Sequence, residues 1–355
     1  MTAHIVDRDY CSSSFLMHRT VVDESKCFSA DLPIRRYRRG HCDLVTNSEE
    51  LLESLKAQVN AVVSRSNAAL ALSGGIDSAI LAKLMPKGSK AYTFKCVVPG
   101  IDVVDESPRA AEYAEECGLD HEIVEVSWED MCEYAPALML HKGAPIHSIE
   151  VQIYKASLRA LEDGFNAFVF GESADSNFGG LSNLLSRDWT FGQYVDRYTN
   201  VMPYFVLGSR ARLELTPFTK HCDDEGYVDA HEHIRDDFFC ESMGSYDNAT
   251  ALAGIEFVAP YAHTWMDCPM DWERVRAGEN KYLVRDVFEK LYPGWTVPAK
   301  RPMPRPVEQW LQYYVPTRSD FVPNCTDGMT GDQKWLVWSL EAFLNLLDER
   351  ERAEL

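Results

Sequence analysis

The stretch AALALSGGIDS at residues 68–78 decides the fold. Its first five residues are apolar and predict a short buried strand, and the pattern at residues 79–85 predicts a helix. The two glycines between them let a backbone approach phosphate oxygens closely, and the start of a helix presents free N–H groups and the positive end of a dipole. The stretch therefore predicts a phosphate-binding turn between a strand and a helix.

The polar residues of this turn indicate which phosphate chemistry it serves. The hydroxyls of Ser73 and Ser78 add hydrogen-bond donors, whereas Asp77 would repel a phosphate unless a cation lay between them, which predicts Mg²⁺. The turn lacks the GK[ST] ending of a Walker loop, and this argues against ordinary γ-phosphoryl transfer. A purely structural strand–turn–helix is the alternative interpretation.

Strands and helices alternate on both sides of this turn, which predicts a parallel sheet with helices on both faces. The expected helices are 47–66, 105–117 and 150–162, and the expected strands are 91–98, 121–127 and 166–171. Ligands of such sheets bind beyond the carboxyl ends of the strands, where the loops 73–78 and 171–180 both fall. Beyond residue 185 the pattern is mostly helical, and residues 1–45 have the pattern of an irregular segment with a basic cluster, RRYRR, at 35–39.

Composition restricts the class of protein. The 355 residues carry a formal net charge of −20, which counts against binding of RNA or DNA because nucleic-acid binders usually have a basic surface. The ten cysteines form no CxxC pair, and no run approaches the ~18 apolar residues that span a bilayer. We expect a reduced, cytoplasmic protein without nucleic-acid or membrane partners.

Two motifs together resemble one known family. The SGGxDS turn is similar to the pyrophosphate loop of the N-type ATP pyrophosphatases, and FGESADSNFGG at 170–180 resembles the G-E-G-x-D-E-x-F-G-G segment of the asparagine synthetase C-terminal (synthetase) domain. Further similar segments follow in the family's order and extend the resemblance over residues 46–310: Asp105-Glu106, Gly118–His121, Ala144-Pro145, Gly254–Glu256 and Lys281–Arg285. The resemblance implies an adenine-nucleotide α-hydrolase-like fold that uses ATP and Mg²⁺.

The resemblance also implies roles for particular residues. Asp77 and Asp175 correspond to metal ligands, and Glu172 occupies the position of the catalytic glutamate, which suits proton removal from an incoming ammonium or amine. The family's R-x-K pattern falls in PAKRPMPRP at 298–306 and implies Lys300 as the catalytic cation, with Arg301 as the alternative. The residues implied to contact the nucleotide are Leu72, Ser73, Gly74, Gly75, Asp77, Ser78, Phe94 and Gly171. For Leu72 and Phe94 the alternative is a plain core residue.

Other positions leave alternatives open. Lys281 and Arg285 lie on one face of a predicted helix and either contact phosphates or pair with acids. His147, Glu150, Gln152 and Lys155 flank the region where the family recognises its acceptor, or decorate a surface helix.

The chain departs from the family at two places. The ~45 residues before the synthetase-like part are too few for the family's glutaminase domain, although SFLMHR at 14–19 and RGH at 39–41 resemble its interdomain linker. We therefore expect an extension at 1–45, a synthetase domain at 46–355, and nitrogen from ammonia, an amine or a separate glutaminase. The family's E-x-R-x-P-F-L-D acceptor motif reads EFVAPYAH at 256–263, which puts aspartate as the substrate in doubt.

The resulting hypothesis is a ligase that adenylates a small carboxylate with ATP, releases pyrophosphate and AMP, and forms an amide. One alternative is a true aspartate-to-asparagine synthetase that uses ammonia. The others are a tRNA-modifying ATP pyrophosphatase and a non-catalytic nucleotide-binding partner module.

Overall fold

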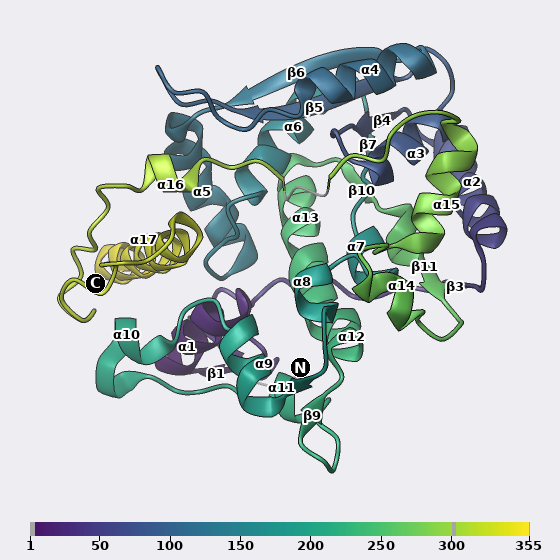
Figure 1. Ribbon diagram of the computed structural model, residues 1–355. Coiled ribbons are helices and arrows are strands. Elements are labelled where there is room, and N and C mark those ends of the chain that lie inside the picture. The colour runs from purple at the N-terminus through teal and green to yellow at the C-terminus, as the bar shows by residue number, and fades with distance from the viewer. Residues whose placement is uncertain (1–3, 300–302, 355) are drawn as a thin grey trace.

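The computed structural model describes residues 4–299 and 303–354 and contains a five-stranded parallel sheet, which lies in the upper half of Figure 1. Its strands are β4 (Ala68–Ala71), β5 (Lys90–Cys96), β6 (Asp120–Val126), β7 (Ala167–Val169) and β10 (Glu256–Val258). They lie in the order β10-β7-β4-β5-β6, and all neighbouring strands run parallel. The predicted α/β fold class is confirmed, although β10 was not among the expected strands.

Alternate residues of β4 pack into two different hydrophobic cores, because successive side chains of a strand point to opposite faces. Ala69 and Ala71 pack into one core and Ala68 and Leu70 into the other. The first core is covered by α1 (Arg8–His18), α5 (Trp128–Lys142), α6 (Glu150–Glu162), α13 (Phe239–Ala253) and α17 (Gly331–Glu354). The second is covered by α2 (Ser48–Arg65), α3 (Ile76–Leu84), α4 (Ser107–Cys117) and α15 (Tyr282–Leu291).

The order of the strands creates a crevice beside β4. The chain moves outward from β4 through β5 to β6 and then returns to β7 on the other side of β4. The loops that leave β4 and β7 therefore diverge, and such reversal points are where open α/β sheets bind ligands. The two glycine-bearing loops predicted to bind the nucleotide follow these two strands.

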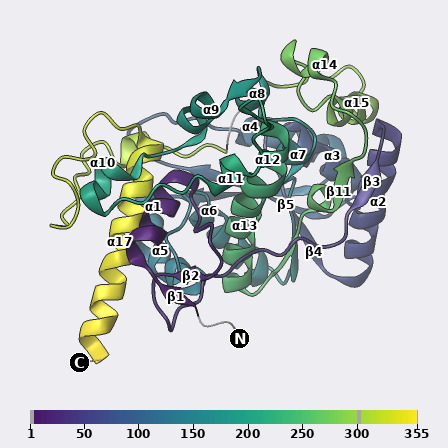
Figure 2. The ribbon, with the colours of Figure 1, turned by 90° about the horizontal axis from the view of Figure 1, so that it is seen from below.

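The N-terminal segment is more regular than its sequence indicates. The expectation of an irregular segment is wrong for residues 8–18, which form α1 with Asp7 as its N-cap, and every residue from Cys11 to His18 is buried. A helix that is covered on nearly all sides has no polar stripe, so its sequence lacks the amphipathic periodicity that predicts a surface helix. Figure 2 shows α1 (purple) beside α17 (yellow), the C-terminal helix.

The remaining elements are short. Three two-stranded sheets pair β1 (Ile5–Val6) with β2 (Lys26–Cys27), β3 (Asp43–Val45) with β11 (Thr264–Met266), and β8 (Trp189–Thr190) with β9 (Tyr227–Val228). The short helices are α7 (Ala174–Asn177), α8 (Ser182–Leu185), α9 (Phe191–Tyr198), α10 (Pro203–Leu207), η1 (Gly208–Arg210), α11 (Thr216–Thr219), α12 (Ala230–His233), η2 (Ile234–Phe238), η3 (Pro260–His263), α14 (Trp272–Arg276) and α16 (Val307–Trp310). Within the described ranges no helix combines the length and the apolar character needed to cross a membrane.

Candidate active site

A cavity of about 360 Å³ opens at the carboxyl ends of β4 and β7. Its wall contains the whole turn 73–78, the residues 170–172 that follow β7, and Asp175 and Lys281. Every described residue that was predicted to serve catalysis, the nucleotide or the metal lines this one cavity. The structure thus brings together positions that lie about 100 residues apart in the chain.

The turn 73–78 is organised by its two serines. The Ser78 hydroxyl accepts a hydrogen bond from the backbone N–H of Ser73 (3.0 Å), and the Ser73 hydroxyl accepts one from the N–H of Gly75 (3.2 Å). Helix α3 begins at Ile76 without a side-chain cap in the described structure, so its first N–H groups are available to an anion in the cavity.

Gly171 sets how closely the two loops approach. A Cβ atom at this position would lie 2.9 Å from the backbone nitrogen of Ser78, which is closer than real Cβ atoms pack, and 3.2 Å from the Cβ of Asp77, which is unusually tight. Only a glycine therefore lets the loop after β7 contact the turn after β4.

Two carboxylates from these loops share one cation. The Nζ atom of Lys281 lies 2.7 and 2.9 Å from the two carboxylate oxygens of Asp77 and 2.9 Å from Oδ1 of Asp175. The side chain of Lys281 is 4% exposed, and those of Asp77 and Asp175 are 14% and 22% exposed. Of the two alternatives predicted for Lys281, pairing with acids is the one that the structure shows.

The position of these acids fits a magnesium ion that also binds phosphate. Mg²⁺ in nucleotide sites typically takes one or two protein carboxylates and completes its shell with phosphate oxygens and water. Asp77 and Asp175 already converge on one cationic group, so their oxygens are suitably placed. Within the described residues, no group of three or more His, Cys, Asp or Glu side chains could hold a metal without such outside ligands.

Glu172 points toward helix α13, which supplies two hydrogen-bond partners. The hydroxyl of Ser242 donates to Oε1 of Glu172 (2.7 Å), and the hydroxyl of Tyr246, one turn further along α13, bonds to the same carboxyl group. Burial raises the pKa of Glu172 and the nearby Asp175 charge raises it further, whereas the Ser242 hydrogen bond lowers it. Burial and the Glu172 charge also raise the pKa of Tyr246 well above its ordinary value. Ser242 and Tyr246 were not predicted, because their spacing on α13 is not a known motif.

Two predicted nucleobase neighbours form another part of the wall. Leu72 is 2% exposed and Phe94 is partly buried, and both line the cavity. The backbone of Leu72 is already engaged, since its N–H donates to the Tyr92 carbonyl (2.9 Å) and its carbonyl accepts from the Thr93 hydroxyl (2.7 Å).

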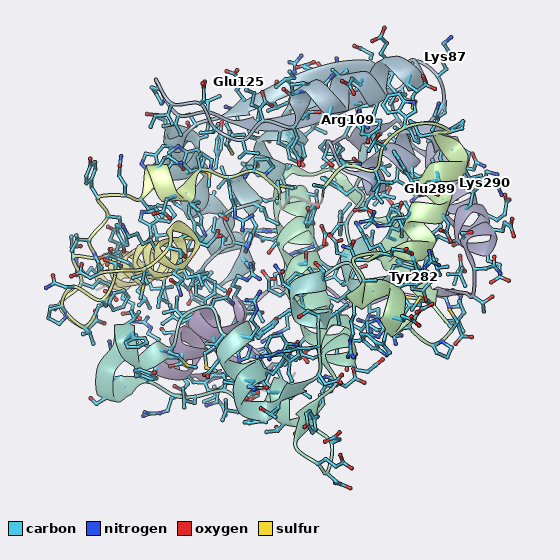
Figure 3. All side chains as sticks on the ribbon, in the orientation of Figure 1. Lys87, Arg109, Glu125, Tyr282, Glu289 and Lys290 are labelled. Carbon is cyan, nitrogen blue, oxygen red and sulfur yellow. The ribbon has the colours of Figure 1, made fainter. Side chains whose placement is uncertain are left out.

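Two arginines also line the cavity. Arg109 extends from α4 (Figure 3) and donates to the carbonyl of Thr296 (3.1 Å), in the segment after α15. Arg285 bonds to the backbone and side-chain oxygens of Asn280, both at 2.7 Å. Lys300 and Arg301, the two candidates for the catalytic cation, lie outside the described residues.

The proposed acceptor-recognition residues lie elsewhere. Glu150 and Gln152 are fully buried and His147 is 7% exposed, so the interpretation of a decorated surface helix is wrong for these three residues. Lys155 is 30% exposed and pairs with Asp130 at 2.7 Å. Glu150 pairs with Lys142 (2.6 Å), and Nε2 of His147 contacts Arg19 (2.8 Å). None of these side chains lines the cavity that holds the turn 73–78.

Comparison with family models assigns the chain. The model of the family described as asparagine synthase matches residues 50–353, which is most of the sequence. The chain belongs to the asparagine synthase family. Members of this family are ATP pyrophosphatase-type enzymes, in agreement with the turn 73–78. No curated protein matches the sequence.

The solved structures that resemble this asparagine synthase family member have low sequence identity to it. An NH3-dependent NAD synthetase from Campylobacter jejuni is 16% identical, with 38% of this chain and 61% of that chain covered and a TM-score of 0.26. An NMN synthetase from Francisella tularensis is 10% identical (72% and 99% covered, TM-score 0.28). A U34-tRNA thiolase from Methanococcus maripaludis is 14% identical (84% and 80% covered, TM-score 0.31). The family assignment therefore depends on the family model and on the site geometry.

Proposed function

We propose that this asparagine synthase family member is an amide ligase that cleaves ATP to AMP and pyrophosphate and adenylates a small carboxylate. The observation that carries the proposal is the convergence of three groups on one cavity: the turn 73–78, the acid pair Asp77 and Asp175, and Glu172 with its raised pKa. A phosphate-binding turn beside a carboxyl group that is poised to accept a proton suits acyl activation followed by amide formation.

In the first half-reaction, a carboxylate oxygen of the acceptor attacks the α-phosphorus of ATP. The bond between the α-phosphorus and the bridging oxygen breaks, and pyrophosphate leaves with that oxygen. The free N–H groups at the start of α3 and the hydroxyl of Ser73 are placed to hold it. Lys281 would stabilise the negative charge that develops on the departing pyrophosphate, since its ammonium group lies at the cavity wall between two acids. Magnesium bound at Asp77 and Asp175 would supply neutralisation of the phosphate charge.

In the second half-reaction, ammonia or an amine attacks the acyl carbon. A C–N bond forms, the nitrogen loses a proton to Glu172, and the acyl C–O bond breaks as AMP leaves. Glu172 suits this role because a carboxylate whose pKa is raised by burial is a stronger base than an exposed one. Ser242 and Tyr246 hold its carboxyl group in place.

The proposal extends to the nitrogen donor and the partners. We propose free ammonia, an amine-bearing substrate or a separate glutaminase as the nitrogen source, and a small metabolite acid as the acceptor. The net charge of −20 supports a small-molecule substrate rather than a nucleic acid. Because the acceptor motif at 256–263 lacks the family's arginine and aspartate, an acid other than aspartate is the first candidate.

Product analysis tests the proposal. The purified protein is incubated with ATP, MgCl2, ammonium and a panel of carboxylates, and we expect AMP and pyrophosphate to form with at least one acid. Asp77→Asn should abolish pyrophosphate–ATP exchange, whereas Glu172→Gln should retain exchange and lose amide formation. Asp102→Asn, which alters an exposed carboxylate outside the cavity, is the matched control. Formation of ADP and orthophosphate would refute the proposal.

A further inference from the structure

The basic cluster at 35–39 forms part of a second cavity, distinct from the candidate active site. This cavity has a volume of about 440 Å³ and lies between the N-terminal segment 18–39 and the start of α13. In both ribbon views the purple N-terminal segment passes beside α13 (Figures 1 and 2). Tyr37 anchors it there, with its ring 6.0 Å from that of Phe239.

The wall of this second cavity carries an excess of positive charge. It contains five arginines and two lysines, against two aspartates and two glutamates. The whole chain has the opposite balance, with 35 basic and 55 acidic residues. Cationic side chains are therefore concentrated at one concave place in a strongly acidic protein.

Most of the cations at the wall have close partners. Arg38 makes two hydrogen bonds of 2.9 Å to Glu24, Lys220 lies 2.7 Å from Asp236, and Lys142 lies 2.6 Å from Glu150. Arg35 lies 2.8 Å from Asp247.

Three arginines lack such a partner. Arg19 and Arg39 come no closer than 3.9 Å to Glu241 and Asp236, and among the described residues Arg36 has no carboxylate within 4.0 Å. The Nε atoms of Arg19 and Arg39 are buried and have no hydrogen-bond partner in the described part of the chain. Burial raises the pKa of Glu241, the acid nearest Arg19, whereas the charges of Arg19 and Lys142 lower it.

Other contacts hold Arg36 and Arg39 in position without neutralising their positive charge. Arg36 donates to the carbonyls of Val21 (2.6 Å) and Asp23 (3.3 Å), and Arg39 stacks between the rings of Phe239 and Trp265, each at 4.3 Å. Carbonyl and ring contacts fix a guanidinium group without supplying a counter-ion. The side chains of Arg19 and Arg39 are only partly buried, at 21% and 25% exposure, and their nearest carboxylates lie 3.9 Å away. Their charges are therefore incompletely paired, and an anion that enters the cavity forms the close contact that the protein does not supply.

We propose that this second cavity binds a small polyanionic metabolite that carries at least two carboxylate or phosphate groups. The size of the cavity fits a metabolite, and arginine pairs with both groups through two parallel N–H donors. The site lies on the other face of α13 from the carboxyl group of Glu172. Cys240, Glu241 and Gly244 of this helix line the second cavity, whereas Ser242 and Tyr246 bond to Glu172.

Calorimetric titration of the full chain with citrate, a trianion, tests this proposal. We expect saturable binding that weakens as the salt concentration rises. Arg19→Gln should raise the Kd about 10-fold or more, because it removes a charge-assisted hydrogen bond at the cavity wall. Arg38→Gln should raise it less, since Arg38 is 73% exposed and already paired with Glu24.

Two control variants separate this site from other anion sites. Arg65→Gln removes a surface arginine that pairs with Glu256 away from the cavity and should leave the Kd unchanged. Lys281→Gln removes the cation of the candidate active site and should also leave citrate binding intact.

The contrary results are equally specific. The proposal is refuted if citrate does not saturate the wild-type protein at millimolar concentration, or if Arg19→Gln and Arg38→Gln bind citrate as tightly as the wild type. Binding of poly-glutamate without binding of citrate would also overturn it and assign the cavity to an acidic protein partner. If Arg19→Gln does not fold, as a thermal melt would show, Arg38→Gln with its exposed side chain decides the outcome.

Discussion

Lys281→Gln tests the central electrostatic feature of the candidate active site. The substitution removes the ammonium group that contacts Asp77 at 2.7 Å and Asp175 at 2.9 Å. Breaking a buried ion pair from one side typically costs about 3–5 kcal/mol, because the partner charge is left uncompensated. Here both partners keep some access to water, with 14% and 22% of their side chains exposed, so we take the lower end, about 3 kcal/mol.

Thermal unfolding measures this loss. Because 1 kcal/mol shifts Tm by about 2–4 °C in domains of 150–250 residues, and by less in longer chains, we expect Tm to fall by up to about 6 °C. Millimolar MgCl2 should restore part of the loss in the variant and have a smaller effect on the wild type, since the divalent cation replaces the missing charge between the two acids.

A surface lysine provides the control. Lys56 pairs with Glu53 at 2.7 Å, but the two side chains are 42% and 71% exposed, so Lys56→Gln should change stability by no more than about 0.5 kcal/mol. If Lys281→Gln were as stable as this control, or if MgCl2 did not distinguish it from the wild type, the idea of a shared cation position would be wrong.

Three further substitutions test other parts of the site. Gly171→Ala should destabilise the fold by about 1–3 kcal/mol and weaken ATP binding, because the added Cβ meets the backbone of Ser78 at 2.9 Å; Gly192→Ala, whose Cβ would meet nothing within 4 Å, should do neither. Ser242→Ala removes a hydrogen bond that favours ionised Glu172. It should therefore move the acidic limb of the kcat–pH profile to higher pH and lower kcat on that limb by up to about 10-fold. An unchanged acidic limb would contradict the role of Ser242. Glu172→Gln should unfold at a higher temperature than the wild type at pH 8 but not near pH 4. The folded-state pKa of Glu172 is raised, so its favourable contribution to stability is present below the unfolded-state pKa and is lost as the pH rises through the folded-state pKa. Equal Tm differences at the two pH values would refute the raised pKa.

Local patterns predicted the elements around the site closely. Helix α2 was expected at 47–66 and is found at Ser48–Arg65, where Asn47 accepts hydrogen bonds from the N–H groups of Glu49 and Glu50. The strand and turn at 68–78 were expected for equally local reasons, since a buried apolar run and a pair of glycines depend on near neighbours in the chain. These features could be derived from the sequence because their causes lie within about one helical turn.

The tertiary structure decided the features that depend on distant partners. Helix α1 was missed because it is buried on nearly all sides and therefore has no amphipathic pattern. The hydrogen bonds of Ser242 and Tyr246 to Glu172 link residues about 70 positions apart, and no spacing rule connects them.

The sequence by itself determined the class of fold, the phosphate-binding turn and the acids that belong to it. These features depend on the spacing of apolar residues and on the positions of glycines, which can both be seen within a short stretch of the chain. Only the folded chain decided that Lys281 lies between Asp77 and Asp175, and that the cluster at 35–39 lines a cavity in which three arginines lack a close carboxylate. The physical reason is that charge pairing depends on distance in space, and in a parallel sheet neighbouring strands are separated by long crossover connections.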